Sequence, residues 1–205
     1  MSAAVEFDAV DILFAQGTGR KREAALKAAL VLLDQGQDRN QIETSTGVIV
    51  GVSNASLTVQ RGQISVLMGL SGSGKSTLLR AANGLNPVTR GSVRVHDGEK
   101  QVDVARCDAA TLRKLRRTGI AMIFQQFGLL PWRTVRENVG FGLELRGESA
   151  EQRRRIVDEK LELVGLSRWA DRYGHELSGG MQQRVGLARA FATDRSEEHT
   201  SELQS

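Results

Sequence analysis

A glycine-rich run at residues 69–77, GLSGSGKST, constrains the fold of this chain more than any other feature. Its pattern is Gly69, four further residues, Gly74, Lys75 and Ser76. In loops with this pattern, backbone N–H groups surround phosphates, the lysine reaches the outer phosphates and the hydroxyl contacts Mg²⁺. We therefore expect a nucleotide to be bound by Gly69, Leu70, Ser71, Gly72, Ser73, Gly74, Lys75, Ser76 and Thr77.

The residues on either side of this loop favour the same interpretation. The apolar run at residues 63–69 predicts a strand buried on both faces, and residues 76–83 predict a helix that Gly84 closes. A plain glycine-rich turn is the alternative, but it seldom places Lys and Ser directly after the last glycine. The glycine spacing also differs from Gly-x-Gly-x-x-Gly, which excludes a dinucleotide fingerprint.

A second run, LSGGMQQR at residues 177–184, predicts the N-terminus of a helix. Ser178 is placed to cap it, and Gly179 and Gly180 form the entry turn. An ordinary capped helix and an anion site share this structure, because the free N–H groups and the helix dipole attract negative charge.

The remaining pattern alternates strands and helices, as expected for an α/β protein. We expect an edge strand at residues 4–14, helices at 22–36 and 39–47, and a strand at 52–62. A strand at residues 91–98, a basic helix at 110–117 and a buried strand at 120–124 follow. A further helix ends at Gly165, and Ser149 and Gln152 lie at capping-box spacing near its start.

These elements suggest a division of the chain. We expect N-terminal strands with a helical insertion at residues 1–61, an α/β core at 62–126 and a helical subdomain at 127–176. The second motif and its helix occupy residues 177–194, and residues 195–205 form a tail.

Composition is that of an ordinary globular domain, with 205 residues, 40% apolar and 25% charged. The longest apolar stretch, Ala28–Leu33, is far too short to span a bilayer, and the acidic N-terminus lacks the features of a secretory signal. The single cysteine cannot form an internal disulfide. The net charge of +4 is explained by arginines paired with acids on helices, so we expect a cytoplasmic protein that does not bind nucleic acid.

With both motifs in this order, the chain resembles the ATP-binding cassette (ABC) family, in which the first run is the Walker A motif and the second the signature motif. The runs VLMGLSGSGKSTLLRAANGLNPVTRG, FQQFGLLPWRTVRENVGFGLELRG and ELSGGMQQRVGLARAFATD are similar to those of importer ATPases for quaternary amines such as choline and glycine betaine. The resemblance covers residues 1–194. It implies a P-loop ATPase core of the ABC type with an inserted helical subdomain, which binds ATP and Mg²⁺ and powers uptake.

The resemblance also implies roles for single residues. Gln125 matches the glutamine loop that contacts Mg²⁺ and water, with Gln126 as the alternative register. Ser76 is the other Mg²⁺ contact, and Phe14 is the candidate that stacks on adenine, with core packing as its alternative. Ser178, Gly179, Gly180 and Gln182 would face the ATP held by a second copy of the subunit.

Further partners are implied by the same family. Trp132 and Pro131 are candidates for contact with a membrane permease, or for packing against the helical subdomain. A substrate-binding protein would act indirectly, and the subunit would lie on the cytoplasmic side of the bacterial inner membrane.

The end of the chain departs from the family pattern. Residues 195–205, RSEEHTSELQS, match the in-frame translation of a short-read sequencing adapter. The expected Walker B strand with its Asp and Glu, and the switch histidine, do not follow. The resemblance implies that the absent strands are neighbours of the strand at residues 63–68, so we expect that strand to be unpaired with its apolar faces uncovered. We expect the chain alone to be inactive and prone to aggregate. An ABC-type ATPase acting on DNA and an inert fragment are the alternatives. The former would carry a long coiled coil, and no sustained heptads are present.

Overall fold

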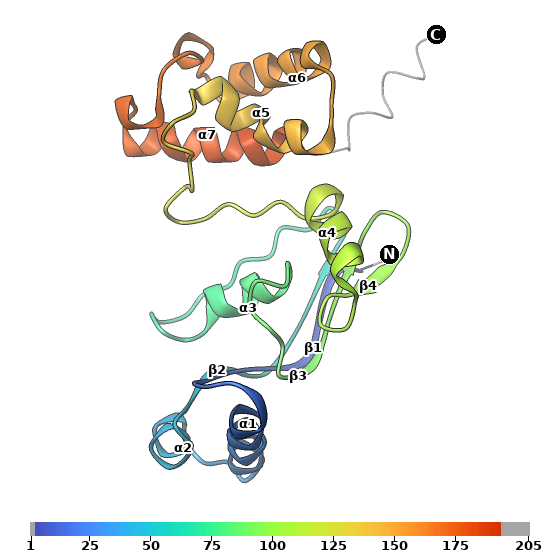
Figure 1. Cartoon of the computed structure of the whole chain (residues 1–205), viewed down its shortest axis with the longest axis vertical. Helices are drawn as coiled ribbons and strands as arrows, with labels where there is room; N and C mark the ends of the chain where they lie inside the picture. Colours follow the sequence, from blue (N-terminus) through green and yellow to red (C-terminus); the bar gives the residue numbers. More distant parts are fainter. Residues whose placement is uncertain (1–2, 194–205) are drawn as a thin grey trace. The chain divides into compact units, whose positions relative to one another are not determined.

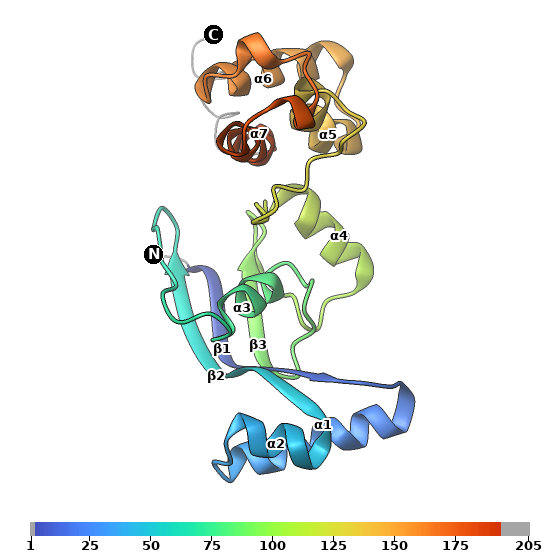
Figure 2. The ribbon, with the colours of Figure 1, turned by 90° about the vertical axis from the view of Figure 1, so that its left-hand side faces the viewer.

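The computed structural model describes residues 3–193 of the chain. It divides into two compact units, residues 1–112 and residues 113–205. Figures 1 and 2 show the first as a sheet with flanking helices and the second as a group of helices. No helix among the described residues is both long and apolar enough to span a bilayer.

The first unit is built on an antiparallel sheet with strand order β2-β1-β3-β4. Its strands are β1 (Ala3–Ala15), β2 (Val48–Gln60), β3 (Arg90–His96) and β4 (Gln101–Asp103). The prediction of an edge strand at residues 4–14 was wrong, because β3 pairs with the free side of β1, for example Phe7 with Val93. Both of these side chains are buried, so the sheet gains apolar burial from this pairing.

A helical insertion, residues 16–47, joins β1 to β2. It contains α1 (Gly19–Asp34) and α2 (Arg39–Thr46), as the sequence predicted. Asp38 caps α2 by accepting hydrogen bonds from the backbone N–H groups of Asn40 and Gln41. The insertion packs on its own apolar cluster, which includes Leu13, Ala29, Ile42, Val48 and Val50.

A buried carboxylate of β1 binds an arginine that links the sheet to the insertion. Asp11 is 1% exposed and accepts hydrogen bonds from the backbone N–H of Asn54 at 2.7 Å and from Nε of Arg90 at 2.6 Å. Arg90 also donates to Asp34 at the end of α1, and this hydrogen bond lowers the pKa of Asp34. Arg90 thus links β1, β3 and the insertion through charge-assisted bonds.

The first unit also contains α3 (Lys75–Ala81), one residue earlier than predicted at its start. No strand forms at residues 63–69 or 120–124, so the prediction of buried strands there was wrong, whereas the expectation that residues 63–68 are unpaired and uncovered is confirmed. Ile64 is 91% exposed and Met68 is 88% exposed, and Ile123 and Phe124 are exposed as well. A strand is maintained by pairing with a neighbour, and no described strand pairs with either segment.

The second unit is helical. Following α4 (Ala109–Thr118), it contains α5 (Val135–Arg146), α6 (Ala150–Leu163) and α7 (Gly179–Ala192), with short 3₁₀ turns η1 (Ser167–Trp169) and η2 (Gly174–Glu176). Ser149 caps α6 by accepting from the backbone N–H of Gln152, whereas the reciprocal bond of the predicted capping box, to the Gln152 side chain, is absent among the described residues. The three long helices share one apolar core: Val135, Val139, Leu143, Val157, Leu161, Leu166, Ala170, Leu177, Val185, Ala188 and Ala192.

Candidate nucleotide site

The glycine-rich loop has the backbone conformation that its glycines predict. Gly69, Gly72 and Gly74 all have positive φ, at 152°, 81° and 95°. At Gly74 a side chain is excluded twice, because a Cβ would also lie 2.3 Å from the backbone carbonyl oxygen of Gly51 in β2. The loop therefore passes close to the strand just before α3 begins.

Lys75 lies at the first position of α3 and turns back into the loop. Its ammonium donates to the carbonyl oxygens of Gly69 at 2.8 Å and Leu70 at 2.6 Å, and to the hydroxyl of Ser73 at 3.3 Å. These acceptors are all neutral oxygens, so no carboxylate compensates its charge within the loop. An anionic group approaching the loop would meet this positive charge.

A cavity of about 310 Å³ opens beside the loop. Gly69, Ser73, Gly74 and Lys75 form one side, and residues of β2, including Ser53, form another. The volume is at the lower end of the range for small-molecule sites. The loop, its lysine and the cavity therefore lie together as the sequence predicted.

The remaining loop residues are placed at its surface. Leu70, Ser71, Gly72 and Ser76 are exposed, whereas Thr77 is partly buried under β2. The Ser76 hydroxyl, next to Lys75, is an oxygen ligand of the kind that Mg²⁺ prefers, so this position fits the predicted metal contact.

Phe14 lies near this site for a reason that sequence reasoning missed. A Cβ on Gly51 would lie 2.7 Å from Cε2 of the Phe14 ring and 3.2 Å from Cγ2 of Thr77. The absence of a side chain at Gly51 thus lets the ring and the start of α3 approach the same point of β2. Phe14 is 37% exposed, so its ring is not buried in the core, and part of it is open to solvent. A glycine inside a predicted strand was the signal available.

The second motif begins α7 with an open surface. Ser178 caps the helix, and its side chain accepts from the backbone N–H of Met181. Gly179 and Gly180 are exposed, and a Cβ on either would meet no atom within 4 Å. Packing within the chain thus does not require these glycines. The amide of Gln182 instead donates to the carbonyls of Gly174 and Leu177.

Gln125 lies in a tight turn of the second unit, where both it and Gln126 are exposed. The backbone N–H of Phe127 donates to the carbonyl of Phe124 at 2.9 Å, and Phe127 has a φ of 58°. A non-glycine residue rarely adopts this conformation, so the surrounding contacts must hold the turn.

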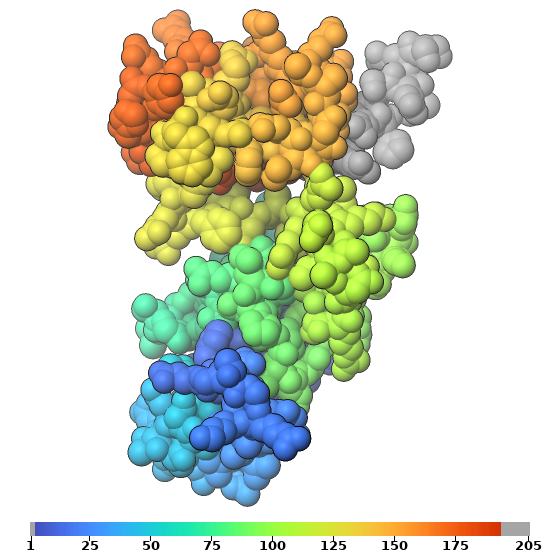
Figure 3. Space-filling view, viewed as in Figure 1, coloured from blue at the N-terminus to red at the C-terminus, as the bar shows by residue number. Residues whose placement is uncertain are grey.

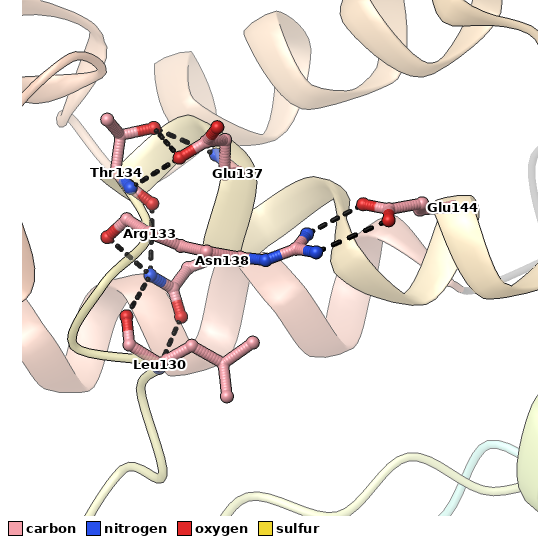
Figure 4. Close-up of polar contacts among 6 residues, drawn as sticks. All are labelled: Leu130, Arg133, Thr134, Glu137, Asn138 and Glu144. Carbon is pink, nitrogen blue, oxygen red and sulfur yellow. Dashed lines mark hydrogen bonds and ion pairs between the residues drawn. The ribbon is translucent and has the colours of Figure 1, made fainter.

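Trp132 lies in a second turn, which the buried side chain of Asn138 holds. Figure 4 shows the contacts of Asn138 with Leu130, Arg133 and Thr134. Asn138 is 0% exposed, and its amide donates to the carbonyls of Leu130, Arg133 and Thr134 while its oxygen accepts from the backbone N–H of Leu130. The turn leaves Trp132 71% exposed.

Charged pairs surround this turn. Arg133 donates to both oxygens of Glu144, which lowers the pKa of that carboxyl. Thr134 caps α5 in a capping box with Glu137, and the backbone N–H of Thr134 lowers the pKa of Glu137. Sequence reasoning missed Asn138, whose polar side chain lies on an otherwise apolar helix face.

Comparison with known proteins identifies the family in which the glycine-rich loop and the second motif occur together. The family described as "ABC transporter" matches residues 52–196, which contain both motifs. The chain belongs to the ABC transporter family. Members of this family bind ATP.

Individual members of the ABC transporter family are close in sequence. The glycine betaine/proline betaine transport system ATP-binding protein ProV of Escherichia coli is 51% identical over 80% of this chain. The glycine betaine/carnitine transport ATP-binding protein GbuA of Listeria monocytogenes is 47% identical over 80% of it. The chain spans about 40% of the length of each of these relatives.

A solved ABC structure is similar in fold. The dimeric post-hydrolysis state of the ATP-binding cassette MJ0796, bound to ADP and Pi, superposes with a TM-score of 0.71 at 30% identity. The match covers 92% of this chain and 69% of that one. The α/β class and the ABC-type P-loop ATPase fold are thereby confirmed.

Proposed function

We propose that this chain is the ATP-binding part of an importer that takes up glycine betaine or a related quaternary amine such as choline. The observation that carries the proposal is the loop at residues 69–77, with the Lys75 ammonium held among neutral oxygens beside a cavity. The amine class is supported by the names of the relatives that are 51% and 47% identical.

In this proposal the loop holds the nucleotide phosphates. Its N–H groups and Lys75 neutralise their charge, and Phe14 offers an aromatic face for adenine. Mg²⁺, held by the Ser76 hydroxyl, would supply charge neutralisation at the outer phosphates. We assign these residues to binding and orientation, and none of the described residues to the role of general base.

We further propose that two copies of the subunit enclose the nucleotide. The open surface at Gly179 and Gly180, beside the capped start of α7, would then face the ATP bound by the other copy, with Ser178 and Gln182 beside it. The similar cassette MJ0796 is described as dimeric, which supports this arrangement.

A membrane permease is proposed to contact the turn at Trp132. A groove of about 710 Å³ lies between α5 and α6, and Trp132, Arg136, Arg153 and Val157 line it. Figure 3 shows the surface of these two helices in yellow and orange. An exposed aromatic beside a hollow is typical of a contact site. The subunit would thereby be held at the cytoplasmic side of the inner membrane, and a substrate-binding protein would act through the permease.

ATP binding by Lys75→Ala tests the core of the proposal. The substitution removes charge-assisted contacts worth roughly 1.5–3 kcal/mol, so calorimetry should show about tenfold to a hundredfold weaker binding. Lys100→Ala, in an exposed turn of the same unit, is the control. Unchanged affinity in Lys75→Ala would reject the assignment.

Copurification tests the permease contact. Trp132→Ala, in the full-length subunit coexpressed with its permease, should weaken copurification and leave ATP affinity unchanged. Leu163→Ala removes another exposed apolar side chain and is the control, since Leu163 is 67% exposed and does not line the groove. Lost ATP binding with intact assembly would contradict the role of Trp132.

A further inference from the structure

The cavity beside the phosphate loop receives one residue from the helical insertion. Arg39, the first residue of α2, lines it together with Lys75 and the loop residues Gly69, Ser73 and Gly74. The cavity thus carries two cationic side chains from segments that are far apart in the sequence. Its lining, all of it within the described residues, includes no Asp or Glu.

Arg39 has no ion pair or hydrogen bond from its side chain within residues 3–193. The neighbouring carboxylate of Asp38 is occupied as the helix cap, accepting from Asn40 and Gln41. The first turn of α2 contains no acidic residue, so Arg39 also faces the positive end of the helix dipole. Arg39 is exposed, so its guanidinium is accessible to an anion in the cavity.

Two cations on one cavity whose lining has no carboxylate favour a ligand with several negative charges. We propose that Arg39 is a second cationic contact for the nucleotide polyphosphate, supplied by the helical insertion and acting beside Lys75. The planar guanidinium binds phosphate oxygens in pairs, which a lysine cannot do. The inference rests on the proposed ATP-binding function and adds a residue outside both motifs.

Nucleotide titration tests the inference. Calorimetry with ATP, ADP and AMP is run on the unaltered chain, on Arg39→Gln and on Arg39→Lys, at two salt concentrations. We expect Arg39→Gln to weaken ATP binding about tenfold, the effect of one charge-assisted contact, and AMP binding much less. Arg39→Lys should retain part of the affinity, and the salt dependence of ATP binding should be shallower in Arg39→Gln than in the unaltered chain.

Arg20→Gln is the matched control, because Arg20 is an exposed arginine at the second position of α1 in the same insertion and does not line the cavity. Thermal unfolding accompanies each titration. Removing a cation from the first turn of α2 should not lower stability. A lower unfolding temperature with unchanged ATP affinity would therefore overturn the inference in favour of a structural role.

The outcomes separate this inference from the proposed function. If Lys75→Ala weakens ATP binding and Arg39→Gln does not, the inference fails and the function stands. If ATP and AMP lose the same affinity in Arg39→Gln, the contact is not to the outer phosphates and the inference also fails. If Lys75→Ala itself has no effect, the proposed function fails.

Discussion

Arg189 in α7 donates a hydrogen bond of 2.7 Å to the backbone carbonyl of Phe127, in the turn that follows Gln125. A second bond of 2.8 Å reaches the carbonyl of Gly128. Burial lowers the pKa of the guanidinium, yet its planar fork serves both carbonyls. Arg189 therefore joins α7, the helix of the signature motif, to the turn that contains Gln125.

Replacing this arginine should loosen the turn locally. Arg189→Leu loses both hydrogen bonds to a turn in which Phe127 has a φ of 58°. We expect amide hydrogen exchange at Phe127 and Gly128 to become about tenfold faster or more, the effect of losing roughly 1.4 kcal/mol. Arg155→Leu, on the exposed surface of α6, is the control. Unaltered exchange at both amides would show that Arg189 does not hold the turn.

Two glycines of the phosphate loop should differ in their tolerance of alanine. Gly72→Ala and Gly74→Ala both place a side chain at positive φ, which costs roughly 1–2 kcal/mol. Only at Gly74 would the Cβ meet the carbonyl of Gly51, at 2.3 Å, whereas at Gly72 it meets no atom within 4 Å. Gly74→Ala should therefore bind ATP more weakly and unfold at a lower temperature than Gly72→Ala. Similar behaviour of the two variants would contradict this account of the loop.

Asn138 should be essential for the stability of the second unit. Asn138→Ala removes the amide that joins Leu130, Arg133 and Thr134, and should cost about 2–3 kcal/mol in the free energy of unfolding, measured with urea. Asn138→Asp should cost more, because a carboxylate would face three carbonyl oxygens. Glu162→Ala, on the exposed face of α6, is the control. An Asn138→Asp variant as stable as the unaltered chain would refute this role.

The capping box of α5 should make stability depend on acid. The hydrogen bond from the backbone N–H of Thr134 lowers the pKa of Glu137 below its ordinary value of 4.5. The unfolded chain therefore binds a proton first as the pH falls, so this contribution is complete above that value and is lost through the lower folded-state pKa. The difference in unfolding free energy between the unaltered chain and Glu137→Gln should shrink from pH 7 towards pH 3. Glu162→Gln serves as the control, and the same trend in both variants would argue against the capping box as its cause.

The sequence predicted the helices and the phosphate loop because these structures are determined by residues that are close together in the chain. The Ser149 cap of α6, the insertion helices and the glycines of the loop depend on residues a few positions apart. The run from Ile64 to Met68 was predicted to be a buried strand from its apolar composition alone. Burial depends on a partner strand, which a local pattern cannot supply, and Ile64, Val66 and Met68 are exposed.

The candidate site residues also divide into those with local causes, which the sequence predicted, and those that depend on distant contacts, which it did not. The loop residues and the cap Ser178 were predicted from spacing, and the structure describes them as a loop beside a cavity and as a helix start. Gly51 and Arg39 were missed because each acts through residues distant in the sequence. Only the pairing of β1 with β2 and the fold of the insertion bring them to the loop.

The pairing of Ala15 with Val48 gives the insertion the topology of an oversized hairpin loop. Its two ends lie one strand spacing apart, about 5 Å, so a two-residue turn could replace residues 16–47 without changing the register of either strand. The phosphate loop, which follows β2, would keep its own backbone in such a shortened protein, whereas the cation at Arg39 would be lost. The insertion is thus separate in sequence from both motifs, and an exchange at Arg39 within it would alter the proposed phosphate contact without changing either motif.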